Sequence, residues 1–133
     1  MYTQQDALGQ LLILKANELR WDSSLERFLR RLRPGGVVAD APLTGGAEST
    51  YEFIIKLTRA VPAVPFVVLE EEGGGMDPLQ AFFPPLPAPR TVAEKGSAAV
   101  SRLGELVGAA LHLLGFNTDL GPVLDLASPA ARR

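Results

Sequence analysis

The chain contains no cysteine and only one histidine. The lack of cysteine excludes a disulfide framework, a zinc ribbon and a thiol nucleophile, and the single histidine excludes any site that needs two. The two signs of charge nearly balance, with 13 basic and 15 acidic residues and a net charge of −2. A chain without a basic excess has no electrostatic basis for binding nucleic acid, so we expect no nucleic-acid partner.

Long apolar runs are also missing. The longest are short, such as Leu11–Leu14, and none approaches the roughly 18 residues of a membrane-spanning helix. The opening residues MYTQQD show no basic segment ahead of an apolar one, which a secretory signal requires. We therefore expect no membrane association and a cytoplasmic location.

The length of 133 residues and the hydrophobic fraction of 47% indicate one modest globular domain. Short apolar runs typical of buried strands occur at Gln10–Leu14, Gly36–Ala39, Phe66–Leu69 and within Asn117–Leu126. Stretches with helical periodicity lie between them, at Trp21–Arg33, in the fifties and at Ser97–Leu114. This alternation predicts an α/β fold with a parallel sheet.

Several residues mark the expected helix ends. Ser23 and Glu26 have the spacing of a capping box at the first helix. Ser49 or Thr50 is the expected cap of the second helix, and Gly115 is a suitable residue to end the third. The long stretch from Glu70 to about Lys95 is rich in proline and predicts an irregular segment, and loops of this length are often functional.

The strongest local feature is the acidic, glycine-rich sequence that follows Phe66–Leu69. In parallel α/β folds, ligands bind beyond the carboxyl ends of the strands. If the strand continues, Glu70 and Glu72 point the same way with Cα atoms roughly 6.6 Å apart. Two such carboxylates are suited to acid/base chemistry or to binding sugar hydroxyls. An acidic loop facing water is the alternative, whereas a phosphate loop fits neither of the usual glycine motifs.

Other polar residues and one motif have competing interpretations. Asp125 follows the last expected strand and would meet Glu70 across the mouth of the sheet, unless it is a turn or cap aspartate. His112 falls opposite the apolar face of its helix, which predicts an exposed and uninvolved side chain. The proline-rich stretch 83–89 resembles a polyproline ligand, but an ordered loop covering the end of the sheet is the preferred interpretation.

Four stretches, taken in order, resemble those of a known family. Gly9–Leu14 and Pro34–Val38 look like its first two strands, and residues 69–74 are similar to its Asp-x-Glu-Gly-Gly motif. Residues 114–126 look like its Leu-Gly-(apolar)-Asn…Ala-Pro-Val-Leu-Asp sequence, and Phe83–Pro87 matches the proline-bearing loop between the two motifs. The chain thus resembles the N-terminal part of glycoside hydrolase family 3, particularly its bacterial β-N-acetylhexosaminidase branch.

The resemblance implies a (β/α)₈ barrel of which residues 1–133 form a single partial domain, the N-terminal half with about four strands. It implies a retaining glycosidase, of the β-N-acetylhexosaminidase or β-glucosidase type, with a carbohydrate substrate and no metal or other cofactor. The family's nucleophile and acid/base pair correspond to positions beyond Asp125. No catalytic residue is therefore assigned, and the chain alone is expected to be inactive.

The resemblance assigns Glu70 to the position of the family aspartate that binds sugar hydroxyls, and Asp125 to the mouth of the barrel. Glutamate is one methylene longer than aspartate, which shifts the carboxylate by about a bond length and affects positioning. Pro78 stands where the family has a substrate-holding arginine, and proline supplies no charge and no donor.

Two alternatives and one physical consequence accompany this interpretation. A non-catalytic, degenerate half-barrel would act by pairing with a partner or by binding glycan weakly. A flavodoxin-like signalling domain has the right length and alternation. It needs a fifth strand, an acidic pocket paired to a phosphorylatable aspartate and a downstream lysine, which are not evident. A half-barrel has two unpaired edges, so we expect the chain to self-associate, aggregate or stay partly molten.

Overall fold

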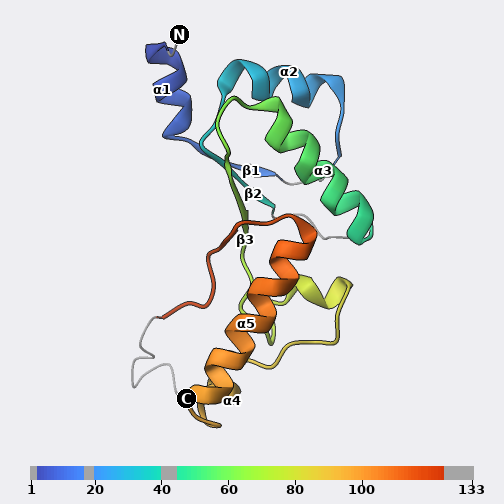
Figure 1. Cartoon of the computed structure of the whole chain (residues 1–133), viewed down its shortest axis with the longest axis vertical. Helices are drawn as coiled ribbons and strands as arrows, with labels where there is room; N and C mark the ends of the chain where they lie inside the picture. Colours follow the sequence, from blue (N-terminus) through green and yellow to red (C-terminus); the bar gives the residue numbers. More distant parts are fainter. Residues whose placement is uncertain (1–2, 17–19, 40–44, 125–133) are drawn as a thin grey trace.

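The structure is a computed structural model that describes residues 3–16, 20–39 and 45–124 (Figure 1). Along the chain it contains α1 (Gln4–Gln10), β1 (Ile13–Ala16), α2 (Ser23–Leu32), β2 (Gly36–Ala39), α3 (Ala47–Ala60), β3 (Phe66–Leu69), the 3₁₀ helix η1 (Pro78–Ala81), α4 (Pro89–Ala93), α5 (Ser97–Leu114) and β4 (Thr118–Asp119). The strands form one parallel sheet in the order β1-β2-β3-β4. The predicted α/β fold with four parallel strands is confirmed.

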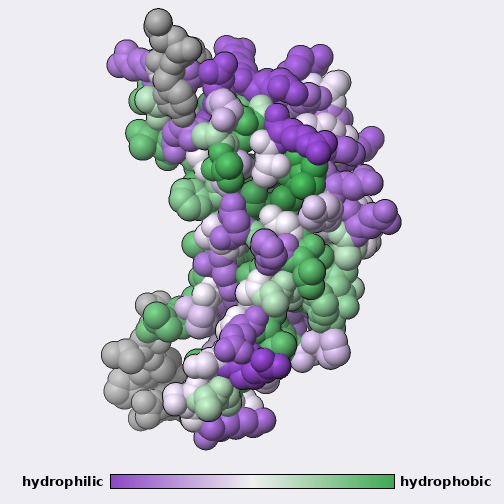
Figure 2. Space-filling model, in the orientation of Figure 1, coloured by the Kyte–Doolittle hydropathy of each residue, from purple (hydrophilic) through white to green (hydrophobic). Residues whose placement is uncertain are grey.

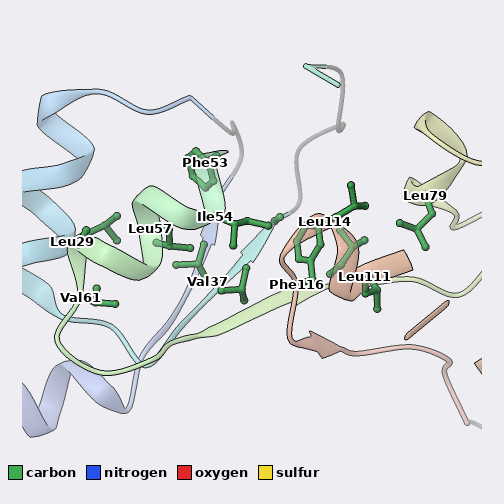
Figure 3. Close-up of a cluster of buried hydrophobic side chains, with 14 residues drawn as sticks. Leu29, Val37, Phe53, Ile54, Leu57, Val61, Leu79, Leu111, Leu114 and Phe116 are labelled. Carbon is green, nitrogen blue, oxygen red and sulfur yellow. The ribbon is translucent and has the colours of Figure 1, made fainter. Parts of the chain in front are cut away.

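The hydrophobic core lies between one face of the sheet and the helices. Leu14, Val37 and Val67 are side by side across β1, β2 and β3. Val37 and Val67 belong to this core, and the partly buried Leu14 packs against it. Figure 3 shows the cluster as a band that runs from the α2 and α3 side chains, across β2, to Leu111 and Leu114 of α5. The alternation of side chains along each strand therefore directs one face of the sheet toward α2, α3 and α5.

The opposite face of the sheet is less covered. Ile13 of β1 and Phe66 of β3 alternate with the core residues, and their side chains are 56% and 59% exposed. Strands β1 and β4 each pair on one side only in the described chain. Apolar residues accordingly reach the surface among polar ones in the elongated molecule (Figure 2). In a closed barrel this face would point inward.

The start of the chain differs from the prediction of a strand at Gln10–Leu14. Residues Gln4–Gln10 form α1, and β1 begins only at Ile13. The reason is a capping box: the Thr3 hydroxyl accepts the Asp6 amide at 3.2 Å, and the Asp6 carboxylate accepts the Thr3 amide at 2.8 Å. The first strand is therefore shorter than the strand that the sequence pattern predicted.

The two predicted helix caps are also corrected. Asp22, not Ser23, caps α2, because its Oδ1 accepts the amides of both Ser24 and Leu25 at 2.8 Å. Helix α3 begins at Ala47, before the expected caps, and the Ser49 and Thr50 hydroxyls donate to the Gly46 carbonyl instead. By contrast, Gly115 ends α5 in the left-handed region at φ 94°, as predicted.

The segment expected to be irregular, between β3 and α5, contains two short helices, η1 and α4. Its proline-rich part is ordered, since the Leu86 amide and carbonyl both form hydrogen bonds with the loop after β3. Among the residues that the structure describes, no helix is both long and apolar enough to cross a bilayer.

Candidate functional site at the carboxyl end of strand β3

The carboxyl end of β3 places one predicted site residue in solvent. Glu70 directly follows Leu69, and its side chain is exposed. Beyond it, the Glu71 amide donates to Asp119 Oδ1 at 3.0 Å, and the Leu120 amide donates to the Leu69 carbonyl at 3.1 Å. Glu70 therefore lies between two hydrogen bonds to the β4 segment, one to the Asp119 side chain and one from the Leu120 amide, and its own side chain is exposed.

The predicted pairing of Glu70 with Glu72 depended on continuation of the strand, and β3 ends at Leu69. Glu72 is half-buried and lines a groove beside α5 together with Glu71. The chain turns here because the Glu72 amide donates to the Met76 carbonyl at 3.0 Å. Asp125, the second predicted site residue, lies outside the described residues.

Sequence reasoning missed Glu71, one of two buried carboxylates of this region, with 3% of the residue exposed. Its Oε1 accepts the Gly73 amide at 2.7 Å, and its Oε2 accepts the Leu79 amide at 3.1 Å. Burial, and after it the charge of nearby Asp77, raises the pKa of the Glu71 carboxyl to about 7, although the two amide donors lower it. The signal in the sequence was strand alternation, which gives Glu71 the same side as Leu69.

Asp77 is the second buried carboxylate, also 3% exposed, and it too was missed. It caps η1 by accepting the Gln80 amide at Oδ1, 3.0 Å away, and its Oδ2 accepts the Leu86 amide at 2.7 Å. The Asp-Pro pair at the start of η1 was visible in the sequence as a helix-start signal. Together, Glu71 and Asp77 fix the course of the loop after β3.

Two glycines make the turn after Glu72 possible. Gly73 and Gly74 have φ values of 72° and 61°, which non-glycine residues rarely adopt. A Cβ on Gly73 would also lie 2.6 Å from the Pro87 carbonyl oxygen, so the proline-rich stretch sits directly against the turn. The Gly73-Gly74 pair is thus required by backbone geometry and by close packing.

A groove of about 240 Å³ separates this loop from α5. One wall consists of Leu86, Pro89 and Val92. The other wall includes Leu103, Val107 and Leu111 of α5.

His112 is exposed on α5, as predicted. Across residues 3–16, 20–39 and 45–124, no three side chains of the metal-binding types come together as a possible metal site.

The arrangement supports binding rather than complete chemistry. Glu70 is an exposed acceptor at the edge where parallel α/β folds bind ligands. Asp119 secures that edge because its Oδ1 accepts the amides of both Glu71 and Gly121 at 3.0 Å. These features place an exposed carboxylate on a hydrogen-bonded backbone at the carboxyl end of β3.

Comparison with known proteins identifies a structural likeness only. No protein-family model matches the sequence, and no curated protein matches it at a significant level. The fold is similar to that of a glycoside hydrolase family 3 β-N-acetylglucosaminidase from Paenibacillus sp. str. FPU-7, with a TM-score of 0.84 and 19% identity. The match covers 93% of this chain and 24% of that protein, so the chain spans about a quarter of its length. At this identity the likeness establishes the fold: four parallel strands alternating with helices, matching part of a family 3 barrel domain.

Proposed function

We propose that this chain is the N-terminal half of the barrel of a family 3-type retaining glycosidase, which acts on β-linked N-acetyl amino sugars or glucosides when complete. The main support is the TM-score of 0.84 over 93% of the chain to a β-N-acetylglucosaminidase of that family. In this proposal Glu70 accepts hydrogen bonds from sugar hydroxyls and Asp125 contributes to the mouth of the barrel. The nucleophile and the acid/base pair come from residues outside this chain, so the chain alone does not hydrolyse glycosides.

The test compares the purified chain with the gene product from its source cells, using a chromogenic N-acetyl-β-glucosaminide. We expect no turnover by the chain and turnover by a native product larger than 14.2 kDa. In that product, Glu70→Ala should lower kcat/KM by about a hundredfold, because a positioning contact is lost. Glu48→Ala, at an exposed position on α3, should have no effect. Turnover by the isolated chain would contradict the proposed division of the site.

A second candidate is a non-catalytic half-barrel that pairs with a partner or binds glycan weakly. It is favoured by glutamate in place of the family aspartate at position 70 and by Pro78, which begins η1 where the family has an arginine. A native product of 14.2 kDa without glycosidase activity would select this candidate.

A further inference from the structure

The surface formed by α1 and α2 displays apolar side chains that the fold does not use. These two helices lie at the end of the molecule away from α4 (Figure 1). Their exposed apolar residues, together with the two that follow α1, are Leu8, Leu11, Leu12 and Phe28. The core cluster of the described residues, with the side chains that pack against it, includes none of these four. An exposed apolar group of this size on a small chain is typical of an interaction surface.

Helix α1 is fastened to the end of α2 by polar groups and backbone, not by its leucines. Asp6 forms an ion pair with Arg33, and the Gln10 side chain donates to the Arg33 carbonyl at 2.7 Å. A Cβ on Gly9 would lie 2.0 Å from the Leu32 carbonyl oxygen, so the two backbones approach closely there. The leucines of α1 are therefore presented on a fixed support, which reduces the entropy cost of binding a partner.

A groove of about 320 Å³ lies between the two helices. It is lined by Leu8, Gly9, Leu12, Phe28, Arg31 and Leu32. The lining is thus mainly apolar, with one guanidinium group. An open apolar groove between two neighbouring helices is suited to a third helix, whose apolar face enters it as in other helix-in-groove complexes.

The charge available at this surface is positive. The acidic side chains of the two helices and of the α2 cap are already engaged in ion pairs or in capping: Asp6, Asp22 and Glu26. Arg31 lines the groove, and Arg27 is exposed one turn earlier on α2. Neither arginine forms a salt bridge within the part of the chain that the structure describes. A complementary ligand therefore combines apolar side chains with carboxylates.

We propose that this groove binds an acidic amphipathic helix of a separate protein partner. Its apolar side chains enter between Leu8, Leu12 and Phe28, and its carboxylates face Arg27 and Arg31. A second copy of the chain does not fit through this same surface, because the arginines of the two copies would face each other. A flat bilayer does not fill a concave groove, and two arginines supply little attraction to it. The inference does not depend on glycosidase activity.

The test is fluorescence anisotropy of a labelled helical peptide titrated with the purified chain. The peptide has about 18 residues of leucine, alanine and glutamate, with leucine at every third or fourth position. We expect saturable binding that weakens as sodium chloride rises from about 0.05 to 0.5 M. Leu8→Ser should weaken binding by about tenfold or more, because an apolar anchor is lost. Arg31→Gln should weaken it about threefold or more and reduce its salt dependence.

The matched controls are on α5, outside the groove. Leu113→Ser replaces a leucine that is 71% exposed, and Arg102→Gln replaces an exposed arginine. Both should bind the peptide as the wild type does. The same peptide with lysine in place of glutamate should bind at least about tenfold more weakly.

Absence of binding, equal binding of the acidic and lysine peptides, or unchanged binding by both groove variants would overturn the proposal. Co-sedimentation with vesicles of phosphatidylcholine and phosphatidylglycerol that is lost in Leu8→Ser would assign the surface to a membrane instead. If the chain binds the peptide and a larger native product does not, the groove belongs to that product's own downstream residues. If circular dichroism shows that Leu8→Ser loses helix, Arg31→Gln and the lysine peptide decide the outcome.

Discussion

At the scale of single residues, backbone geometry explains why positions 73 and 74 are glycine better than contact with a ligand does. Gly73 lies in the left-handed region and against the Pro87 carbonyl, whereas Gly75 has open space where a Cβ would be placed. The three consecutive glycines of this segment therefore have different roles, which the sequence alone does not distinguish.

Gly73→Ala should destabilise the chain by about 2 kcal/mol or more, because it combines an unfavourable positive φ with a steric clash against backbone. Gly75→Ala is the matched control and should change stability by less than about 0.5 kcal/mol. Urea unfolding monitored by circular dichroism measures both. Equal effects of the two substitutions would show that the turn is not constrained as described.

At the scale of elements, the short strand β4 depends on side chains for its attachment. It has only two residues, Thr118 and Asp119. The preceding Asn117 side chain accepts the Val67 amide at 2.8 Å and donates to the Pro65 carbonyl at 2.9 Å. Asn117 and Asp119 thus supplement, with side-chain hydrogen bonds, the short backbone ladder between β3 and β4.

Asn117→Ala should destabilise the chain by about 1–2 kcal/mol, because the side-chain hydrogen bonds to Val67 of β3 and to Pro65 before it are lost and backbone groups are left unpaired. Asn117→Asp keeps the acceptor for the Val67 amide and loses the donor to Pro65, so its effect should be smaller. Thermal unfolding of the three chains tests this order. If aspartate is as disruptive as alanine, the acceptor bond contributes little.

At the scale of the whole molecule, the sheet is open. Ile13 and Phe66 are exposed on the face opposite the helices, and β1 and β4 form its two edges. Apolar side chains on an uncovered sheet face, together with unpaired edges, favour association. The proposed partners are a second copy of the chain or the rest of a barrel.

The purified chain should show a mass above 14.2 kDa in light scattering after size-exclusion chromatography. Replacing both Ile13 and Phe66 with lysine should shift it toward the monomer, because charges on this face oppose its burial. Val64→Lys, at a residue that is 85% exposed before β3, is the control and should leave the mass unchanged. A monodisperse wild-type monomer with cooperative melting would contradict the prediction.

The sequence by itself determined the alternation of strands and helices, the parallel sheet, the strand Phe66–Leu69 and the end of α5 at Gly115. These features depend on local periodicity and on residues with strong backbone preferences. They can therefore be predicted from one sequence. It also placed Glu70 at the carboxyl end of β3, because that position needs only the end of the strand.

Only the tertiary structure decided which acidic residues are buried. Strand alternation gives Glu71 the same side as Leu69, but its burial and its hydrogen bond to the Leu79 amide depend on the return of the chain at residue 79. The N-cap residues of α2 and α3, Asp22 and Gly46, also differ from those that the sequence pattern predicted. Burial and hydrogen-bond partnership are properties of distant contacts, and therefore local pattern cannot assign them.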